Sequence, residues 1–314
     1  MTKKNFLYFE NINFHKKNLK EIKKTFNAFP VKSLSGVKKL NEKIKKNIDI
    51  IYCDPLYFYS SNFLKQFKNL KFLASSTTST DFIDLDYCNN KKIKLISLEK
   101  EQKFLSSISS TAEHTFGLIL LITRKYLSSI YSLDKFKFNR RPYGGYKMLS
   151  NMCIGIVGYG RLGKLVKKIA SGFSMKIITC DIKNKNYKKV LKKIKNDSDI
   201  ISLHIPSKKN TNFFSKKIFS NLNKPFFLIN TSRGDIVDER FIIHLFKSNK
   251  ILGYATDVLK NEFNPNFNIK KNLIFKNRKK YNIVITPHIG GSTIDAWQLT
   301  ENRVITKLKK YLKI

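Results

Sequence analysis

The sequence has few cysteines and no long apolar run, and each shortage excludes a class of protein. The four cysteines lie far apart, without a C-x-x-C pair or a metal-ligand spacing, so we expect neither a disulfide framework nor a metal site. The longest apolar run, 116–122, is too short to span a bilayer, and the N-terminal apolar run stops at Glu10, unlike a signal peptide. We therefore expect reduced thiols, a cytoplasmic location and no membrane partner.

Acidic residues are also scarce. There are 22 Asp and Glu against 61 Lys and Arg, a formal net charge of +39. This imbalance alone would suggest a partner such as nucleic acid. However, the lysines are scattered along the chain and not gathered into one run, so we expect a diffusely basic surface and no specific nucleic-acid site. A binding scaffold that contacts protein or nucleic acid stays open as an alternative function.

The clearest motif is an apolar run, 153–157, that breaks into glycines. Gly158, Gly160 and Gly163 have the G-x-G-x-x-G spacing, and the residues after them repeat with helical periodicity. In a strand–turn–helix unit the first glycine makes the tight turn, the second lets the backbone approach a pyrophosphate, and the third lets the helix pack closely on the strand. The helix N-terminus then faces the phosphates. This pattern predicts a dinucleotide site.

A second strand, 175–181, ends in a carboxylate. Asp181 lies about 20 residues beyond the glycines, where a carboxylate binds the ribose hydroxyls. Because no arginine follows Asp181 directly, the sequence favours NAD. Lys183 is close enough to leave NADP open.

Strands and helices alternate along the whole chain, which predicts parallel sheets covered on both faces. We expect strands at 5–9, 48–53, 70–75 and 93–97 in the first hundred residues, with helices at 19–26, 37–46, 60–67 and 81–89 between them. The polar loop 75–81 follows a strand end, where open α/β sheets bind ligands. The helix 110–126 is apolar nearly all round and is interpreted as interdomain or intersubunit packing, and His114 within it as structural.

Three polar residues each follow a different strand of the glycine-motif domain: Arg233, Glu262 and His288. Because the carboxyl ends of parallel strands share one edge, we expect these side chains to converge. An arginine can clamp a carboxylate with two hydrogen bonds, and a histidine can exchange a proton near neutral pH. A carboxylate would orient the imidazole. Together these roles suit reversible hydride transfer at a hydroxy acid.

Several of these segments resemble the D-isomer-specific 2-hydroxyacid dehydrogenases. The resemblance covers nearly the whole chain and follows the family's order of motifs. The segments that carry it are 158–163, 230–234, Asp257-Val258 with Glu262, 286–291, 111–115 and 81–86.

The resemblance implies the architecture and the partners. It implies two doubly wound parallel-sheet α/β domains, with a Rossmann cofactor domain, 109–288, inserted into a flavodoxin-like substrate domain, 1–108 and 289–314. It also implies NAD as the cofactor, a short form without a regulatory domain, and a homodimer formed through the helix 111–126.

The resemblance further implies roles for individual residues. Arg233 would bind the substrate carboxylate, His288 would be the acid/base and Glu262 its partner, while the backbone around Thr78 and Ser79 would hold substrate. The implied cofactor-binding residues are Gly158, Gly160, Arg161, Leu162, Gly163, Asp181, His204, Thr211, Thr231, Asp257 and Gly290.

Some positions depart from the family pattern. Ser79 stands where a glycine is usual, and Phe263 follows Glu262 where proline is usual. Glu262, in place of the glutamine of formate dehydrogenases, argues against that branch. These departures leave the hydride chemistry intact and the substrate open. 3-Phosphoglycerate, which the net charge mildly favours, and hydroxypyruvate or glyoxylate are the leading candidates.

Overall fold

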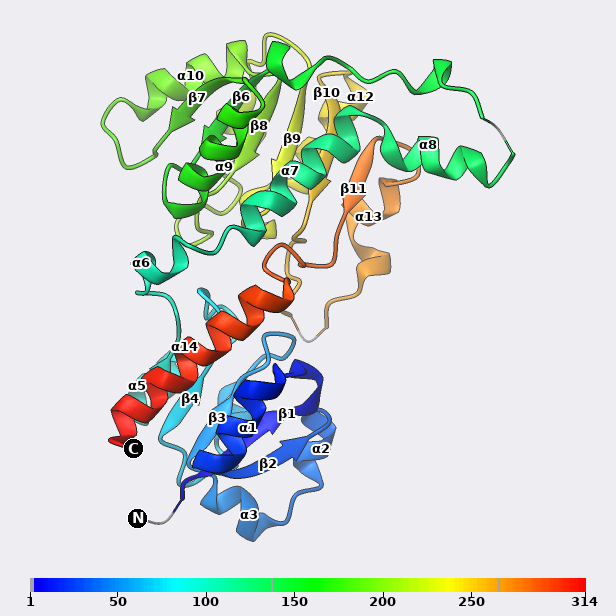
Figure 1. Cartoon of the computed structure of the whole chain (residues 1–314). Helices are drawn as coiled ribbons and strands as arrows, with labels where there is room; N and C mark the ends of the chain where they lie inside the picture. The colour runs from blue at the N-terminus through cyan, green and yellow to red at the C-terminus, as the bar shows by residue number, and fades with distance from the viewer. Residues whose placement is uncertain (1–2, 137, 265) are drawn as a thin grey trace. The chain divides into compact units, whose positions relative to one another are not determined.

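The computed structural model describes residues 3–136, 138–264 and 266–314 (Figure 1). The chain divides into two compact units. Unit 1 comprises 1–105, 263–266 and 292–314, and unit 2 comprises 106–262 and 267–291. These boundaries lie within a few residues of the expected 1–108, 109–288 and 289–314. The short passage of 263–266 through unit 1 was not predicted from the sequence.

Unit 1 is built on a five-stranded parallel sheet. The strands are β1 (Asn5–Phe9), β2 (Asn27–Val31), β3 (Ile50–Tyr52), β4 (Phe72–Ala74) and β5 (Lys94–Ile96). Their order, β2-β1-β3-β4-β5, is that of flavodoxin-like sheets. The helices are α1 (Lys16–Thr25), α2 (Leu34–Lys38), α3 (Glu42–Asn47), α4 (Ser61–Leu64), α5 (Leu85–Asn90), α6 (Gln102–Leu105) and α14 (Ile294–Leu312).

Two predictions in unit 1 were wrong in detail. The edge strand β2 was missed because it contains Pro30, which has no N–H to donate, and because its residues are mostly half-buried or exposed. The single helix expected at 37–46 is two helices, α2 and α3. They separate at Leu40 and Asn41, where the Asn41 side chain accepts a hydrogen bond from Lys43 N and caps α3.

Unit 2 contains a six-stranded parallel sheet. Its strands are β6 (Cys153–Val157), β7 (Lys176–Cys180), β8 (Ile200–Leu203), β9 (Phe226–Asn230), β10 (Ile251–Thr256) and β11 (Ile283–Ile285), in the order β7-β6-β8-β9-β10-β11. From β6 the chain adds β7 on one side and then β8 on the other side, so the strand order reverses between β6 and β8. Ligands of open α/β sheets bind at such a switch point.

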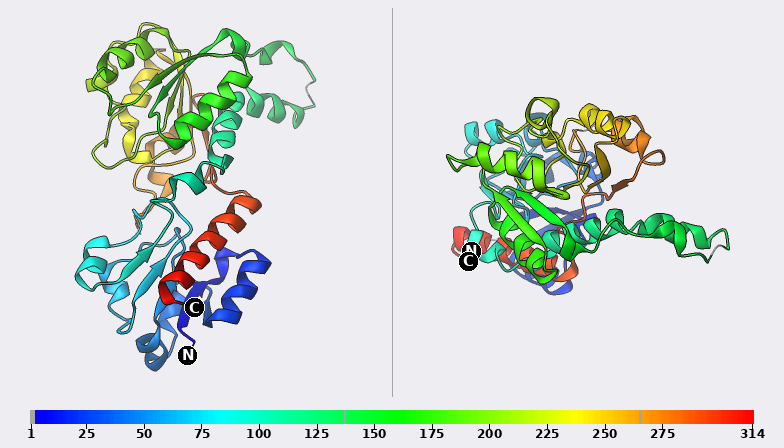
Figure 2. Two further views of the ribbon diagram at one scale, coloured as in Figure 1. Left: turned by 60° about the vertical axis from the view of Figure 1, so that its left-hand side comes forward. Right: turned by 90° about the horizontal axis from the view of Figure 1, so that it is seen from above.

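Helices cover both faces of this sheet, as the doubly wound prediction requires. One core lies under α10 (Tyr187–Asp197), α11 (Lys216–Phe219), α12 (Glu239–Lys247) and α13 (Leu273–Asn277). The other lies under α7 (Ser110–Thr123) and α9 (Arg161–Gly172). Figure 2 shows α7 and α9 beside the sheet.

Helix α7 explains the longest apolar segment of the chain. By length and composition alone, 102–123 could cross a membrane. In the structure, Ala112, Phe116, Leu118 and Ile119 of α7 are buried in a core shared with α9 and the strands. Its apolar face is therefore used inside its own unit, which differs from the expected role of this helix in a dimer interface.

The exposed apolar residues come after α7 instead. Lys125 has a positive φ of 52° and separates α7 from a second helix, α8 (Tyr126–Leu133), which was predicted as part of the first. In α8, Ile130 and Tyr131 are 56% and 61% exposed. Phe136 and Phe138, just beyond it, are almost fully exposed. Figures 1 and 2 show this segment, the α8 arm (residues 126–136 and 138–148), extending away from the sheet of unit 2.

Candidate active site

The glycine turn between β6 and α9 has the geometry that a dinucleotide site requires. Gly158 has φ of +98°, and a Cβ there would lie 2.3 Å from the carbonyl oxygen of His204. A Cβ on Gly163 would lie 2.1 Å from the carbonyl oxygen of Gly158, so only glycine lets α9 pack this closely on β6. A Cβ on Gly160 would meet nothing within 4 Å, which leaves room for a pyrophosphate beside the backbone. These residues fit NAD.

Other predicted cofactor residues surround this turn. Asp181 lies just after β7, and its carboxylate accepts the Lys183 N–H at 3.0 Å. Arg161 and Leu162 begin α9 and are half-buried, and Arg161 Nη1 donates to the carbonyl of Ile108 at 3.3 Å. Thr211 is exposed in the loop after β8. By contrast, Thr231 is buried, and its hydroxyl is bonded to that of Thr115 on α7 at 2.8 Å.

His204 directly follows the switch-point strand β8, beside Gly158. Its Nε2 is bonded to Ser202 Oγ at 2.8 Å, while its buried Nδ1 has no hydrogen-bond partner among the described residues. Burial lowers the pKa of His204 to about 4, so the imidazole is neutral at pH 7. A buried polar atom without a partner at this point is consistent with a cofactor group bonding there.

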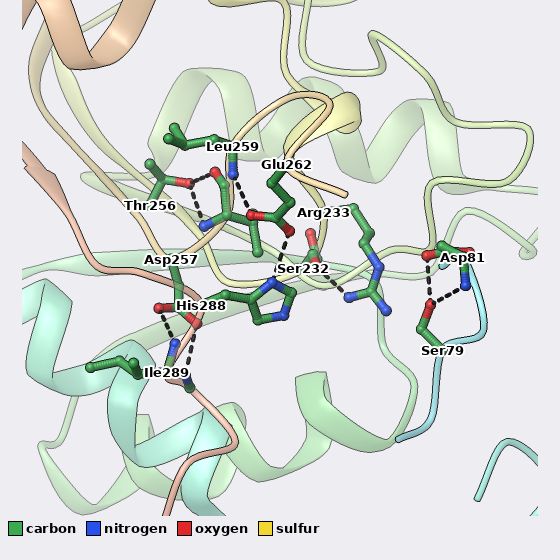
Figure 3. Close-up of polar contacts among 12 residues, drawn as sticks. Ser79, Asp81, Ser232, Arg233, Thr256, Asp257, Leu259, Glu262, His288 and Ile289 are labelled. Atoms are coloured by element: carbon green, nitrogen blue, oxygen red, sulfur yellow. Dashed lines mark hydrogen bonds and ion pairs between the residues drawn. The ribbon is translucent and has the colours of Figure 1, made fainter. Parts of the chain in front are cut away.

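The three predicted catalytic residues come from neighbouring strands. Arg233 follows β9, Glu262 follows β10 and His288 follows β11, and these strands are adjacent in the sheet. Their side chains therefore come from one edge. In Figure 3 the guanidinium of Arg233 and the imidazole of His288 extend into the same region.

Glu262 and His288 form a direct pair. Glu262 Oε1 lies 2.8 Å from His288 Nδ1, and Glu262 Oε2 accepts the Leu259 N–H at 3.0 Å (Figure 3). Because a carboxylate accepts at Nδ1, we assign the proton of the neutral ring to Nδ1. This leaves Nε2, on the side of the ring away from Glu262, to exchange a proton with a substrate.

The turn that carries His288 is held by Asp257. His288 has a positive φ of 55°, which is unfavourable for a residue with a side chain. The Asp257 carbonyl accepts the His288 N–H at 2.9 Å, and its carboxylate accepts the N–H groups of Ile289 at 2.8 Å and Gly290 at 2.7 Å. A Cβ on Gly290 would lie 2.9 Å from Asp257 Oδ2, so glycine permits this close approach.

Two further residues support Asp257. Thr286 donates its hydroxyl hydrogen to Asp257 Oδ1 at 2.6 Å, and His114 Nε2 lies 3.3 Å from the same oxygen and 3.0 Å from Thr286 Oγ1. Burial alone would raise the pKa of Asp257. Hydrogen bonds from His114, Thr286 and the Gly290 and Ile289 N–H groups outweigh burial and lower it.

Arg233 is placed by a close approach between two loops. Its backbone carbonyl accepts Asn230 Nδ2 at 2.9 Å, and its Nη1 donates to the Ser232 carbonyl at 2.6 Å. A Cβ on the next residue, Gly234, would lie 2.1 Å from the carbonyl carbon of Leu259. Gly234 thus lets the Arg233 loop pack against the loop that carries Glu262.

The predicted substrate loop belongs to unit 1, where it follows β4. Thr77 Oγ1 donates to the Ser79 carbonyl at 2.6 Å. Ser79 Oγ donates to Asp81 Oδ2 at 2.5 Å (Figure 3). The backbone N–H groups of Thr78 and Ser79 have no acceptor among the described residues. Ser79 stands where the family usually has glycine, and it therefore leaves these backbone donors available.

His114 was interpreted as structural, and its contacts with Thr286 and Asp257 agree with that interpretation. The supporting roles of Thr286, Leu259, Gly234 and Ser202 were not predicted. One signal was present, because Ser202 lies near the end of β8 and His204, two residues later, continues the alternation of side chains on the same side. The bonds of His114 to Thr286 and Asp257 join residues far apart in the sequence, and no local pattern predicts them.

Comparisons with known proteins agree with this geometry. The family model for the NAD-binding domain of D-isomer-specific 2-hydroxyacid dehydrogenases matches residues 116–290, more than half of the chain. A hydroxypyruvate reductase from Thermotoga maritima is 28% identical over 87% of this chain and 87% of its own length. An aromatic 2-oxoacid reductase from Clostridium sporogenes is 33% identical over 72% of this chain and 71% of its own.

A solved structure agrees in fold. It is a D-lactate dehydrogenase from Aquifex aeolicus in complex with NAD and lactic acid, which superposes with a TM-score of 0.79 at 24% identity. The match covers 98% of this chain and 96% of that one.

These matches confirm the predicted family, fold class, cofactor and enzyme class. The chain belongs to the D-isomer-specific 2-hydroxyacid dehydrogenase family, and it is an NAD-dependent oxidoreductase that acts on the CH–OH group of a 2-hydroxy acid.

Proposed function

We propose that Arg233, Glu262 and His288 carry out the reversible oxidation of a D-2-hydroxy acid to its 2-oxo acid. The observation that carries this proposal is the 2.8 Å contact between Glu262 Oε1 and His288 Nδ1, made by loops from adjacent strands. When bound, NAD accepts the hydride from C2 of the substrate, and NADH returns it in the reverse direction.

The residues of this chain handle the proton and the carboxylate. In oxidation, His288 Nε2 takes the hydroxyl proton as C2 loses its hydride, and in reduction it returns that proton to the carbonyl oxygen. Glu262 stabilises the charged imidazole and holds its orientation. The planar guanidinium of Arg233 binds the substrate carboxylate. The backbone N–H groups of Thr78 and Ser79, in unit 1, are further candidates as hydrogen-bond donors to a substrate.

The experiment is NADH oxidation by the purified protein with 3-phosphohydroxypyruvate, hydroxypyruvate, glyoxylate and pyruvate. We expect His288→Ala to lower kcat by about 100-fold or more on any acid that the protein reduces. The matched control is His244→Ala, because His244 is an exposed histidine on α12 whose ring stacks on Phe241. Equal loss in both variants, or full activity in His288→Ala, would contradict the proposed role.

The relatives differ in the acid that their names specify, so family membership leaves the substrate open. 3-Phosphoglycerate, glycerate and lactate are the hydroxy acids that correspond to the phosphorylated acid, hydroxypyruvate and pyruvate in this panel. The panel therefore tests the reaction and the substrate together.

We also propose a cytoplasmic homodimer formed through the α8 arm. Exposed apolar residues concentrate in this segment, and a two-fold axis would let the same surface on two copies cover itself. We expect light scattering to give the mass of a dimer, and the double variant Ile130→Asp/Tyr131→Asp to give a monomer. A wild-type monomer would overturn the proposed dimer and leave the reaction unaffected.

A further inference from the structure

The amino edge of the unit 1 sheet, at which all five parallel strands begin, is rich in lysine. A short segment leads into each strand: the last three residues of the preceding helix and the connection to the strand or, before β1, residues 3–4 alone. Each segment contains at least two lysines, and together they hold eleven lysines and one acidic residue, Asp49, in 27 residues. The five segments are 3–4, 23–26, 45–49, 62–71 and 88–93.

The sheet brings these segments together although they are far apart in the sequence. Every strand pair in it is parallel, so all five segments reach the same edge. The last turn of α14 joins them, because Lys94 Nζ, at the first residue of β5, lies 3.7 Å from the centre of the Tyr311 ring. Figures 1 and 2 show the end of α14 at the same end of unit 1 as α3. The lysines are thus scattered along the chain and concentrated in space.

The composition of the chain does not account for this concentration. The loops at the opposite, carboxyl edge of the same sheet, after β1, β3 and β4, are residues 10–15, 53–60 and 75–84. They contain no lysine or arginine and four acidic residues. A uniform excess of lysine would have placed cations at both edges.

Helix ends do not account for it either. Lysines are favoured near helix C-termini, which carry the negative end of the helix dipole. Unit 2 has the same succession of helix and strand, yet its six corresponding segments hold only nine Lys and Arg, and two Asp, in 38 residues. Two of the six contain no cation. These segments are 149–152, 170–175, 195–199, 217–225, 245–250 and 275–282.

The charge on the amino edge is mostly uncompensated within the unit. Nine of the eleven lysines are exposed. Among the described residues, Lys45 alone of the eleven has a carboxylate at ion-pair distance, Glu42 Oε1 at 2.8 Å. The carboxylate of Asp49 accepts the Asn5 N–H at 3.0 Å. The edge therefore presents a positive potential to the solvent.

A row of asparagine side chains runs along the same edge. Asn27 Nδ2 donates to Asn5 Oδ1 at 3.2 Å, and Asn5 Nδ2 donates to the Asn47 carbonyl at 2.8 Å. Asn69 Nδ2 donates to Asn47 Oδ1 at 3.3 Å. The row follows the strand order β2-β1-β3-β4. Asn47 Nδ2 has no acceptor among the described residues, and amide groups beside lysines are donors to phosphate oxygens in nucleic-acid complexes.

We propose that the amino edge of unit 1 binds double-stranded nucleic acid through its phosphate backbone, without reading its sequence. Four strand spacings give an edge about 19 Å long, and a duplex carries about eleven phosphates over that length. A membrane surface is disfavoured, because proteins that bind it insert apolar side chains. None of the described residues in the five segments is a large apolar residue that is exposed.

The first test measures fluorescence anisotropy with two labelled DNA duplexes of unrelated sequence, each about 20 base pairs long. We expect both to bind with a Kd of about 1 μM at about 50 mM salt, and about 100-fold more weakly at about 200 mM, because phosphate contacts release counterions. Absence of binding to both duplexes would overturn the proposal, and binding to phosphatidylserine vesicles in that case would assign the edge to a membrane surface. A difference of about tenfold or more between the two duplexes would overturn sequence-independent binding.

The second test locates the binding on the edge. The variant Lys46→Gln/Lys68→Gln/Lys91→Gln removes one exposed lysine before each of β3, β4 and β5. We expect it to weaken duplex binding by about tenfold or more, and to reduce the slope of log Kd against log salt concentration by about 2–3. Because these side chains are exposed, the fold should be unaffected, which circular dichroism checks.

The matched control is Lys168→Gln/Lys189→Gln/Lys193→Gln, which removes the same charge from exposed positions on α9 and α10 of unit 2. It should change the affinity by less than about twofold. Equal weakening in the two variants would show that the charge of the whole chain attracts the duplex, and would overturn the role of the edge. Neither result bears on the proposed reaction, because the edge contains none of its residues.

Discussion

At the scale of single residues, Asp257 has the most direct control over the position of His288. Its carboxylate accepts two backbone N–H groups from the turn that follows His288, and its carbonyl accepts the His288 N–H. The positive φ of His288 is retained because these bonds determine the turn. The side chains of His114 and Thr286 both contact Oδ1 of the same carboxylate. Asp257 is thus a positioning residue for the acid/base, in addition to its predicted contact with the cofactor.

We predict that Asp257→Asn lowers the free energy of unfolding at pH 7 by about 1–3 kcal/mol, because an amide nitrogen would face a backbone donor in a buried site. The lowered pKa of Asp257 gives the pH dependence its sign. The ionised carboxylate stabilises the folded state above its unfolded-chain pKa of about 3.9, and this contribution is lost as the pH falls through the lower folded-state value. The difference between variant and wild type should therefore shrink below about pH 4.

The measurement is urea unfolding of both proteins from pH 7 to pH 3. Asp197→Asn is the control, because Asp197 is exposed at the end of α10 in the same unit. A difference that grows as the pH falls would contradict the account of Asp257.

At the scale of elements, different glycines of the turn between β6 and α9 serve helix packing and cofactor binding. We predict that Gly163→Ala lowers stability by about 2 kcal/mol or more, since its Cβ would overlap the Gly158 carbonyl oxygen. Gly160→Ala should leave the melting temperature nearly unchanged, because its Cβ would meet no protein atom within 4 Å. It should nevertheless weaken NADH binding by about tenfold, because that space is reserved for the pyrophosphate.

Thermal melts and NADH fluorescence titrations of the two variants test this separation. Gly172→Ala, at the last residue of α9 and also without a neighbour within 4 Å, is the control for both measurements. Unchanged NADH affinity in Gly160→Ala would place the cofactor elsewhere.

The elements that the sequence predicted well are those with a local signal. The strands β6, β8, β9 and β10 of unit 2 are fully or mostly buried, so they appear as apolar runs, and the glycines fixed the turn after β6. The strand β2 was missed because Pro30 argues against a strand and its edge position gives no apolar run. The break before α8 was missed because it depends on the left-handed conformation of Lys125, a residue type that gives no turn signal.

At the scale of the whole molecule, the chain order predicted which strand ends would carry the site, because the carboxyl ends of parallel strands share an edge. The sequence could not predict the contacts that fix it. The bond from His288 to Glu262 and those from His114 to Asp257 and Thr286 depend on how separate loops pack. Residue types and spacing suggested the chemistry of Arg233, Glu262 and His288, and packing determines their geometry.

The passage of 263–266 through unit 1 has a testable consequence. The ring of Phe263 packs on the unit 1 core, 6.2 Å from the ring of Phe82, while Glu262, the preceding residue, belongs to unit 2. We predict that Phe263→Ala lowers the stability of unit 1 by about 1–3 kcal/mol. It should also lower kcat, because the backbone beside Glu262 loses its anchor.

Hydrogen exchange measured by mass spectrometry can assign the loss to one unit. Phe263→Ala should speed exchange in the strands of unit 1. The matched variant Phe267→Ala removes a ring packed on the larger core of unit 2 and should speed exchange there. The reverse assignment would show that Phe263 is not an anchor in unit 1.

The most direct test of the central claim follows the hydride itself. The protein is given NADH carrying deuterium at the transferable position of the nicotinamide together with the 2-oxo acid that it reduces fastest. The product is then analysed by chiral chromatography and mass spectrometry. We predict a D-2-hydroxy acid with deuterium on C2, formed by the wild type and by His244→Ala and lost in His288→Ala. An L-configured product, or a product without deuterium on C2, would contradict the account.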